Sequence, residues 1–281
     1  MTSRTMQTIT VTSASDSPLA RLGWLLRDAW TITRRDLLHW RMQPGVVVVN
    51  WVFPIMIALM FGWLFGGAID VPEGTSYFEY LMPGLFAITM FFGLEATMTA
   101  VATDVTKGIT DRFRSMPINA AAVVLGRCFA DMLNSLVGLA VMVVAGLLLG
   151  WDWHGGTGAA LLAVGLLLLL RFGLLWVGIF IGLNVKGPEA VSAVQILVWP
   201  ASFLSNAFVD PSTMPVWLGT IAQWNPLSAT ASAIRELFMN PGWQSDTWIG
   251  QNALLMAVVW PLVMVAIFLP LSARKYRSLS R

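Results

Sequence analysis

Residues 46–66 read VVVVNWVFPIMIALMFGWLFG, and this stretch decides the class of fold. Asn50 is its one strongly polar residue, and a helix over the range is about 31 Å long at 1.5 Å per residue. Because that length covers the hydrocarbon core of a bilayer, we expect a transmembrane helix here.

Similar apolar runs follow at about 79–103, 121–150, 159–183, 189–208 and 250–271. The whole chain is 57% hydrophobic and 11% charged, whereas soluble domains carry roughly 25% charged residues. We therefore predict an all-α polytopic membrane protein with six transmembrane helices, about 46–66 being the first. An even number of spans places both termini on one side.

The basic residues indicate which side that is. Fifteen of the seventeen lie in the N-terminal segment, the loops after the second and fourth spans, or the C-terminal tail. Lys and Arg near span ends are retained in the cytoplasm, and Trp gathers near the opposite boundary at Trp151, Trp153, Trp217 and Trp224. Both termini are thus predicted to be cytoplasmic.

The N-terminal 43 residues divide into two parts. Residues 1–18 are rich in Ser and Thr, and we expect a disordered cytoplasmic tail. Residues 19–43 predict an amphipathic helix lying flat in the cytoplasmic interface. Its apolar face would hold Leu22, Leu25, Leu26, Ala29, Trp30, Thr33, Leu37 and Trp40. An ordinary juxtamembrane anchor without a partner is the alternative.

The segment from about 210 to 250 is semi-apolar and is broken by Pro211, Pro215, Pro226 and Pro241. No piece of it is long enough to span a bilayer, and irregular backbone cannot face lipid. We predict a re-entrant outer segment of two short helices before the last span.

Several kinds of chemistry are excluded. The single cysteine, Cys128, and two histidines, His39 and His154, are too few for most metal sites. No Gly-Lys dipeptide occurs, so the chain has no GxxxxGK[ST] phosphate loop. The basic residues are too segregated to form a nucleic-acid surface. We predict no catalytic residue, no metal site and no cofactor bound by this chain.

Glu95 and Arg171 lie inside predicted spans, where an ionisable group is costly unless it pairs or faces water. Their depths differ by only about 5 Å by helix rise, so a structural ion pair and a role in transport are both open. Arg127 and Asp131, four residues apart, predict a local salt bridge.

The loop after the second span carries Val105, Ile109, Phe113 and Met116 at helical spacing, and Pro117 follows. This pattern predicts a short amphipathic helix over about 104–116. Such a helix could dock a cytoplasmic partner. Alternatively, the loop could have no binding role and serve only to keep this side of the protein in the cytoplasm through its basic residues.

Three regions of the chain resemble a known family. The first runs from Lys107-Gly108 through Pro117 to Gly126-Arg127 and Asp131, the second is 205–218, and the third is Trp224-Asn225-Pro226-Leu227-Ser228 with Arg235 downstream. In order and spacing they are similar to permease subunits of ABC-2 type exporters, in particular daunorubicin-resistance-type drug-efflux permeases. Asp104 departs from the family, which often has Glu there, but keeps the charge.

The resemblance implies that residues 44–281 are an ABC-2 transmembrane domain in the inner membrane of a bacterial cell. It implies a homodimer or heterodimer of permeases bound to two ABC ATPase subunits, which hold the ATP and Mg. The helix at 104–116 would be the coupling helix seated on the ATPase. Its implied contact residues are Asp104, Lys107, Gly108, Ile109, Arg112, Phe113, Arg114 and Pro117.

The resemblance also implies a substrate path along the dimer interface, lined by spans one, two and five. The candidate residues are Asn50, Met56, Met60, Met90, Phe91, Phe92, Met98, Gln195, Ser202 and Asn206. Met and aromatic side chains favour a small amphipathic drug or natural product as cargo. The alternative is a lipid or lipid-linked glycan, and a membrane-embedded enzyme or a channel is less favoured.

Overall fold

The computed structural model describes residues 44–66, 76–108, 120–185, 187–242, 245 and 247–278, together with Gly23, Arg27, Trp30, Thr31, Thr33, Arg34, Leu38 and Met42. Within these residues every regular element is a helix. The long elements are α2 (Pro44–Phe65), α3 (Tyr77–Thr106), α5 (Ala120–Leu148), α6 (Gly156–Asn184), α7 (Pro188–Phe203) and α11 (Ala253–Ser278). The short ones are η1 (Pro211–Thr213), α8 (Val216–Trp224), α9 (Pro226–Phe238) and α10 (Trp248–Gln251). The all-helical class predicted from composition is confirmed.

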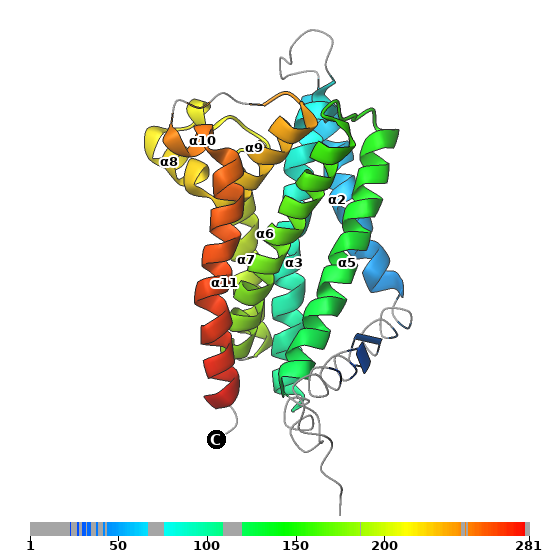
Figure 1. Cartoon of the computed structure of the whole chain (residues 1–281), viewed down its shortest axis with the longest axis vertical. Coiled ribbons are helices and arrows are strands. Elements are labelled where there is room, and N and C mark those ends of the chain that lie inside the picture. Colours follow the sequence, from blue (N-terminus) through cyan, green and yellow to red (C-terminus); the bar gives the residue numbers. More distant parts are fainter. Residues whose placement is uncertain are drawn as a thin grey trace, which may run out of the picture.

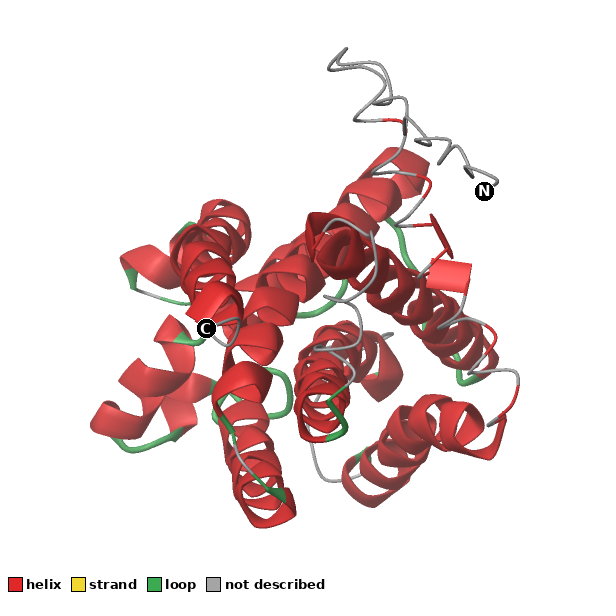
Figure 2. Ribbon diagram, turned by 90° about the horizontal axis from the view of Figure 1, so that it is seen from below, coloured by secondary structure: helices red, strands yellow, loops and turns green. Residues whose placement is uncertain are grey.

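The long helices run side by side along the long axis, and the short helices gather at one end (Figure 1). The C-terminus lies at the opposite end. Figure 2 shows the same bundle from below, with several long helices seen nearly end-on. At its centre α6 packs against α3, α11 and α9, while α2 and α7 lie against α3.

Four helices in the described part of the chain are long and apolar enough to cross a membrane: Tyr77–Thr106, Val124–Leu148, Gly156–Asn184 and Ala253–Tyr276. The other two predicted spans correspond to α2 and to α7, which are 22 and 16 residues long. At 1.5 Å per residue α7 measures only about 24 Å, less than a hydrocarbon core of about 30 Å. The predicted extension of this span to residue 208 is wrong, because the helix ends at Phe203.

Two glycines at GxxxG spacing explain the close packing of α6 on α3. A Cβ on Gly178 would lie 2.8 Å from the Leu94 carbonyl oxygen, and one on Gly182 would lie 2.7 Å from that of Met98. Small residues at this spacing allow two helix backbones to approach closely. The pair thus serves packing inside the protomer.

Candidate functional site

The end of the bundle at which α11 ends also holds three of the predicted coupling residues, Asp104, Lys107 and Gly108. α3 continues through Asp104 to Thr106 and stops at Lys107 and Gly108, whose φ of 63° suits glycine. Asp104 therefore belongs to the last turn of α3 and not to a separate helix. Ile109, Arg112, Phe113, Arg114 and Pro117 lie outside the described residues.

Two contacts tie this end of the bundle together. Arg127, near the start of α5, forms an ion pair with Asp104 on α3. Thr33, from the predicted amphipathic helix, is fully buried and donates a hydrogen bond of 2.9 Å to the Gly126 carbonyl oxygen. Sequence spacing predicted Asp131 as the partner of Arg127, whereas the ion pair in the structure joins two helices.

Arg171 is 2% exposed and lies at the crossing of α3, α5 and α6. Its Nη2 donates to Thr97 Oγ1 at 2.7 Å and is 3.7 Å from Asp131 Oδ2, and its Nε donates to Ser135 Oγ at 2.7 Å. Thr97 Oγ1 is also 2.7 Å from Asp131 Oδ2. The ion partner of Arg171 is thus Asp131, and Glu95 is not part of this cluster.

Glu95 lies on the side of α3 that faces α7. Gln195 on α7 lies near its carboxylate and donates to Thr99 Oγ1 at 3.3 Å. One turn away, Phe92 and Trp199 are in contact at a ring-centroid distance of 5.0 Å. In the described part of the chain no basic side chain forms a salt bridge with Glu95.

The predicted path residues separate into two groups in this protomer. Met56 and Met60 on α2 are 60% and 49% exposed, and Phe53 beside them contacts Trp199 at 5.4 Å between ring centroids. Phe91, Phe92 and Gln195 are partly exposed, whereas Met90, Met98, Ser202 and Asn206 are buried. Asn50 lies in α2, but its side chain is outside the described residues. An open surface that includes part of the predicted set therefore runs along α2 and α7.

At the other end of the bundle, Arg235 from α9 is 2% exposed and holds the turn after α7. Its Nη1 and Nη2 donate to the carbonyl oxygens of Asn206 at 3.0 Å and Ala207 at 2.9 Å, and its Nε donates to Tyr80 O at 3.2 Å. The guanidinium carbon also lies 4.4 Å from the centroid of the Tyr80 ring. Burial lowers the pKa of Arg235, and Tyr80 and Tyr77 oppose that shift.

Asn225 explains why α7 ends where it does. Its Nδ2 donates to the carbonyl oxygens of Ala201 and Leu204 in the last turn of α7, at 2.9 and 2.6 Å. Its Oδ1 accepts from Leu227 N and so caps α9. Two short helices were predicted in this outer segment; the structure has α8 and α9 and, in addition, η1 and α10.

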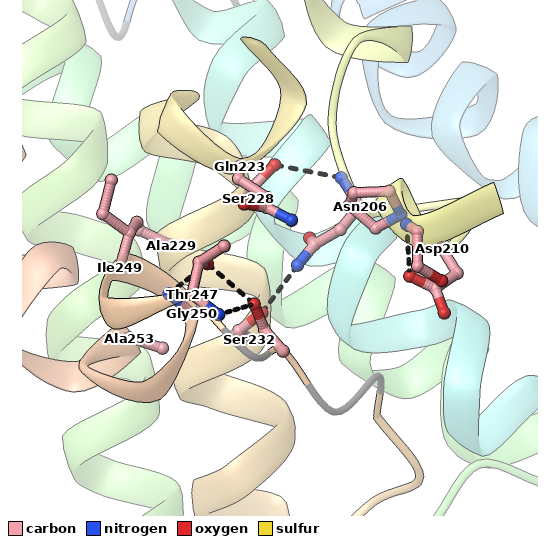
Figure 3. A pocket seen from close by; sticks show the side chains of 13 residues that line it. Asn206, Asp210, Gln223, Ser228, Ala229, Ser232, Thr247, Ile249, Gly250 and Ala253 are labelled. Atoms are coloured by element: carbon pink, nitrogen blue, oxygen red, sulfur yellow. Dashed lines mark hydrogen bonds between the residues drawn. The ribbon is translucent and has the colours of Figure 1, made fainter. Parts of the chain in front are cut away.

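A polar pocket of about 250 Å³ opens beside this junction (Figure 3). Asn206, Asp210, Gln223 and Ser232 are among its lining residues, together with Thr247 from α10's N-cap. Asn206 was predicted from the sequence for the substrate path, but the pocket was not predicted. The walls of the pocket come from several separate segments between residues 206 and 253, and only the fold brings these segments together.

Comparison with known proteins places these features in a family. Residues 27–239 match the family described as ABC-2 type transporter. The daunorubicin resistance ABC transporter permease protein DrrB1 of Streptomyces coeruleorubidus is 33% identical over 96% of this chain and 92% of its own length. The probable doxorubicin resistance ABC transporter permease protein DrrC of Mycobacterium tuberculosis is 23% identical over 74% of this chain and 75% of its own length. A putative transport permease, ycf38, of Porphyra purpurea is 23% identical over 81% of this chain and 79% of its own length.

Proposed function

The chain belongs to the ABC-2 type transporter family, and from this premise we propose that it is the transmembrane permease subunit of an ATP-driven exporter. Its cargo would be small amphipathic drugs or natural products, moved out of the cytoplasm or inner leaflet. The observation that carries the proposal is the 33% identity to a daunorubicin resistance permease over almost the full length of both chains. Energy would come from two separate ABC ATPase subunits with ATP and Mg, because this sequence has no phosphate loop.

The contacts at the C-terminal end of the bundle support a coupling role for it. The Arg127–Asp104 pair joins the end of α3 to α5, and Thr33 joins the N-terminal segment to Gly126. A push on residues 104–117 would therefore reach α3 and α5 together. In the proposed orientation this end is cytoplasmic and faces the ATPase.

The open apolar surface of α2 and α7 supports a path shared with a second permease. Met56, Met60 and Phe203 are 60%, 49% and 43% exposed, and they surround the aromatic contacts of Phe53 and Trp199. Adaptable Met and rigid aromatic side chains suit amphipathic cargo of varied shape. In this proposal two copies, or this chain and a paralogue, meet along that surface.

Co-purification with the ATPase subunit encoded beside this chain tests the proposal. We expect the wild-type protein to retain an ATP-hydrolysing complex, and Phe113→Asp and Arg114→Glu to lose it while staying folded. Arg274→Glu is the matched control, because Arg274 is an exposed base at the same end, on α11. If no ATPase binds the wild type, or if Arg274→Glu abolishes binding as strongly as Arg114→Glu, the proposed coupling site is wrong.

The class of cargo is tested on the same complex. Daunorubicin-like amphipathic drugs are expected to stimulate ATP hydrolysis, whereas lipids and lipid-linked glycans are not. Stimulation by a lipid-linked glycan alone would favour the alternative cargo.

A further inference from the structure

The pocket beside α9 is built for hydrogen bonding. Eight of its thirteen lining residues carry a hydroxyl, an amide or a carboxylate, and none of these thirteen described residues is basic or aromatic. The acid is Asp210, which is half-buried; its Oδ1 accepts from Ser212 N at 2.8 Å, so Oδ2 is left for another donor. A wall with one carboxylate and no base disfavours an anionic ligand.

Asn206 has an unmet hydrogen bond in this pocket. It is 8% exposed, its Nδ2 donates to Ser232 Oγ at 2.6 Å, and its Oδ1 has no hydrogen-bond partner among the described residues. Rotating the amide by a half-turn would exchange the two atoms and leave the nitrogen unpaired instead. This oxygen has almost no contact with solvent, and a buried polar atom without a partner costs about 1–3 kcal/mol, so a turn of the side chain that gave it a partner in the pocket would be favoured.

The remaining polar groups surround this amide. Figure 3 shows the Asn206 side chain directed toward Ser232, with Gln223 and Thr247 on other walls. Within the described part of the chain the side-chain amide of Gln223, which is half-buried on α8, forms no hydrogen bond. Arg235 nearby does not line the pocket, and its Nε, Nη1 and Nη2 each donate to a backbone carbonyl oxygen, of Tyr80, Asn206 and Ala207.

From these observations we propose that the pocket binds an uncharged or cationic polyhydroxylated group about the size of one sugar ring. Amide, hydroxyl and carboxylate groups match the donors and acceptors of vicinal hydroxyls. The volume of about 250 Å³ is below the ~300–1,000 Å³ of sites for drug-sized ligands, so one ring or head group fits and a whole cargo does not. The group belongs either to a soluble molecule or to the head of a glycolipid. The outward orientation of the pocket rests on the proposed function, whereas the proposed binding of a sugar-sized group does not depend on it.

The test is saturation-transfer NMR with the full chain in phosphatidylcholine nanodiscs, without ATPase or ATP. We expect methyl glucoside and glucosamine to bind, and glucuronate to bind more weakly because of the Asp210 carboxylate. Gln223→Met keeps the side-chain volume and removes the amide, so affinity for methyl glucoside should fall three- to tenfold. Gln251→Met is the matched control, since Gln251 is exposed on α10 and does not line the pocket.

Asp210→Asn gives a result that misfolding cannot imitate. The amide oxygen still accepts from Ser212 N, but the negative charge is gone, so glucuronate binding should rise while glucosamine binding falls. Absence of saturation transfer to every sugar, or equal binding by wild type, Gln223→Met and Asp210→Asn, would overturn the proposal. Adding a monoglucosyl diacylglycerol to the nanodiscs separates the sources: it displaces methyl glucoside if the site takes lipid head groups and leaves it bound if the site takes soluble molecules. Loss of ATPase binding in the coupling experiment would leave this result unchanged.

Discussion

Replacing Gly93 by alanine should destabilise the protein, although alanine is the better helix former by about 1 kcal/mol. Gly93 lies on α3 where Arg171 crosses from α6. A Cβ there would lie 2.4 Å from Arg171 Nε and 2.8 Å from its Cζ, closer than two unbonded atoms can approach. Arg171 is 2% exposed, so its side chain has no neighbouring solvent into which it could shift. It would have to give up its hydrogen bonds to make room for the new methyl group.

The expected cost follows from the hydrogen bonds that Arg171 would lose. The bonds from Nε to Ser135 and from Nη2 to Thr97 are both 2.7 Å, and hydrogen bonds to charged groups are worth about 1.5–3 kcal/mol each. After subtracting about 1 kcal/mol for the gain in helix propensity, the net loss is about 2–5 kcal/mol. With an unfolding entropy of about 2.1 cal/mol/K per residue, a loss of this size lowers the unfolding midpoint of the 281-residue chain by about 3–8 °C.

Cys128 supplies the assay. It is the single cysteine of the chain and is 5% exposed, so a thiol-reactive fluorogenic maleimide labels it only when the bundle opens. Heating the detergent-solubilised protein at one scan rate gives midpoints that can be compared between variants. Gly165→Ala on α6 is the control, because a Cβ at that position meets no atom within 4 Å and the midpoint should stay or rise.

Arg171→Met separates the clash from other effects of the alanine. Alone it should be destabilising by about 3–5 kcal/mol, since Asp131 loses its cation. In the Arg171→Met background, however, Gly93→Ala should cost nothing further. The reasoning is refuted if Gly93→Ala unfolds with the wild-type midpoint, or if its cost is the same with and without the Arg171 side chain.

Three further outcomes are expected. Arg235→Lys should lower the unfolding midpoint by an amount equivalent to about 2–4 kcal/mol, because one ammonium cannot reach all three carbonyl oxygens that the guanidinium holds; an unchanged midpoint in the thiol assay would contradict this. Asp104→Asn should cost about 1–3 kcal/mol in the same assay, since both partners of its ion pair are about four-fifths buried and Arg127 would lose its counter-charge. In a Cys128→Ser background, a cysteine at Ser212 should react with an impermeant maleimide added outside intact cells and one at Ser278 should not; the reverse pattern would invert the proposed orientation.

The sequence was sufficient for most helices because a bilayer span has a strong signal of length and apolarity. The predicted runs 79–103 and 159–183 correspond to α3 and α6, which extend a few residues further at each end. The end of α7 could not be predicted in this way. Residues up to Phe208 are apolar enough to continue the helix, but Asn225 binds the carbonyl oxygens of its last turn from 21 residues away.

Motif residues were easier to notice than to interpret. The Asn-Pro-Leu stretch and Arg235 were singled out by resemblance to a family, which says nothing of what the side chains contact. In the structure Asn225 caps α9 and binds the last turn of α7. Arg235 donates to the carbonyl oxygens of Asn206 and Ala207, in the turn that follows α7. Gly84 leaves room for that turn, because a Cβ there would lie 2.6 Å from the Ala207 oxygen. These residues therefore shape the end of the bundle that carries the short helices and the wall of its pocket.

Counting residues along each helix was not sufficient to predict which charged side chains pair inside the bundle. Helix rise places Glu95 and Arg171 at similar depths, yet depth does not say which face of a helix a residue occupies. Asp131 is eleven residues into α5, or about 16 Å from its start, so it is a third ionisable group within the bundle rather than an interfacial one. Packing of α6 on α3 then directs Arg171 to Thr97 and Asp131. Asp131 therefore compensates the charge of Arg171, and their contacts with Thr97 and Ser135 join α3, α5 and α6, whereas Glu95 takes no part in this cluster.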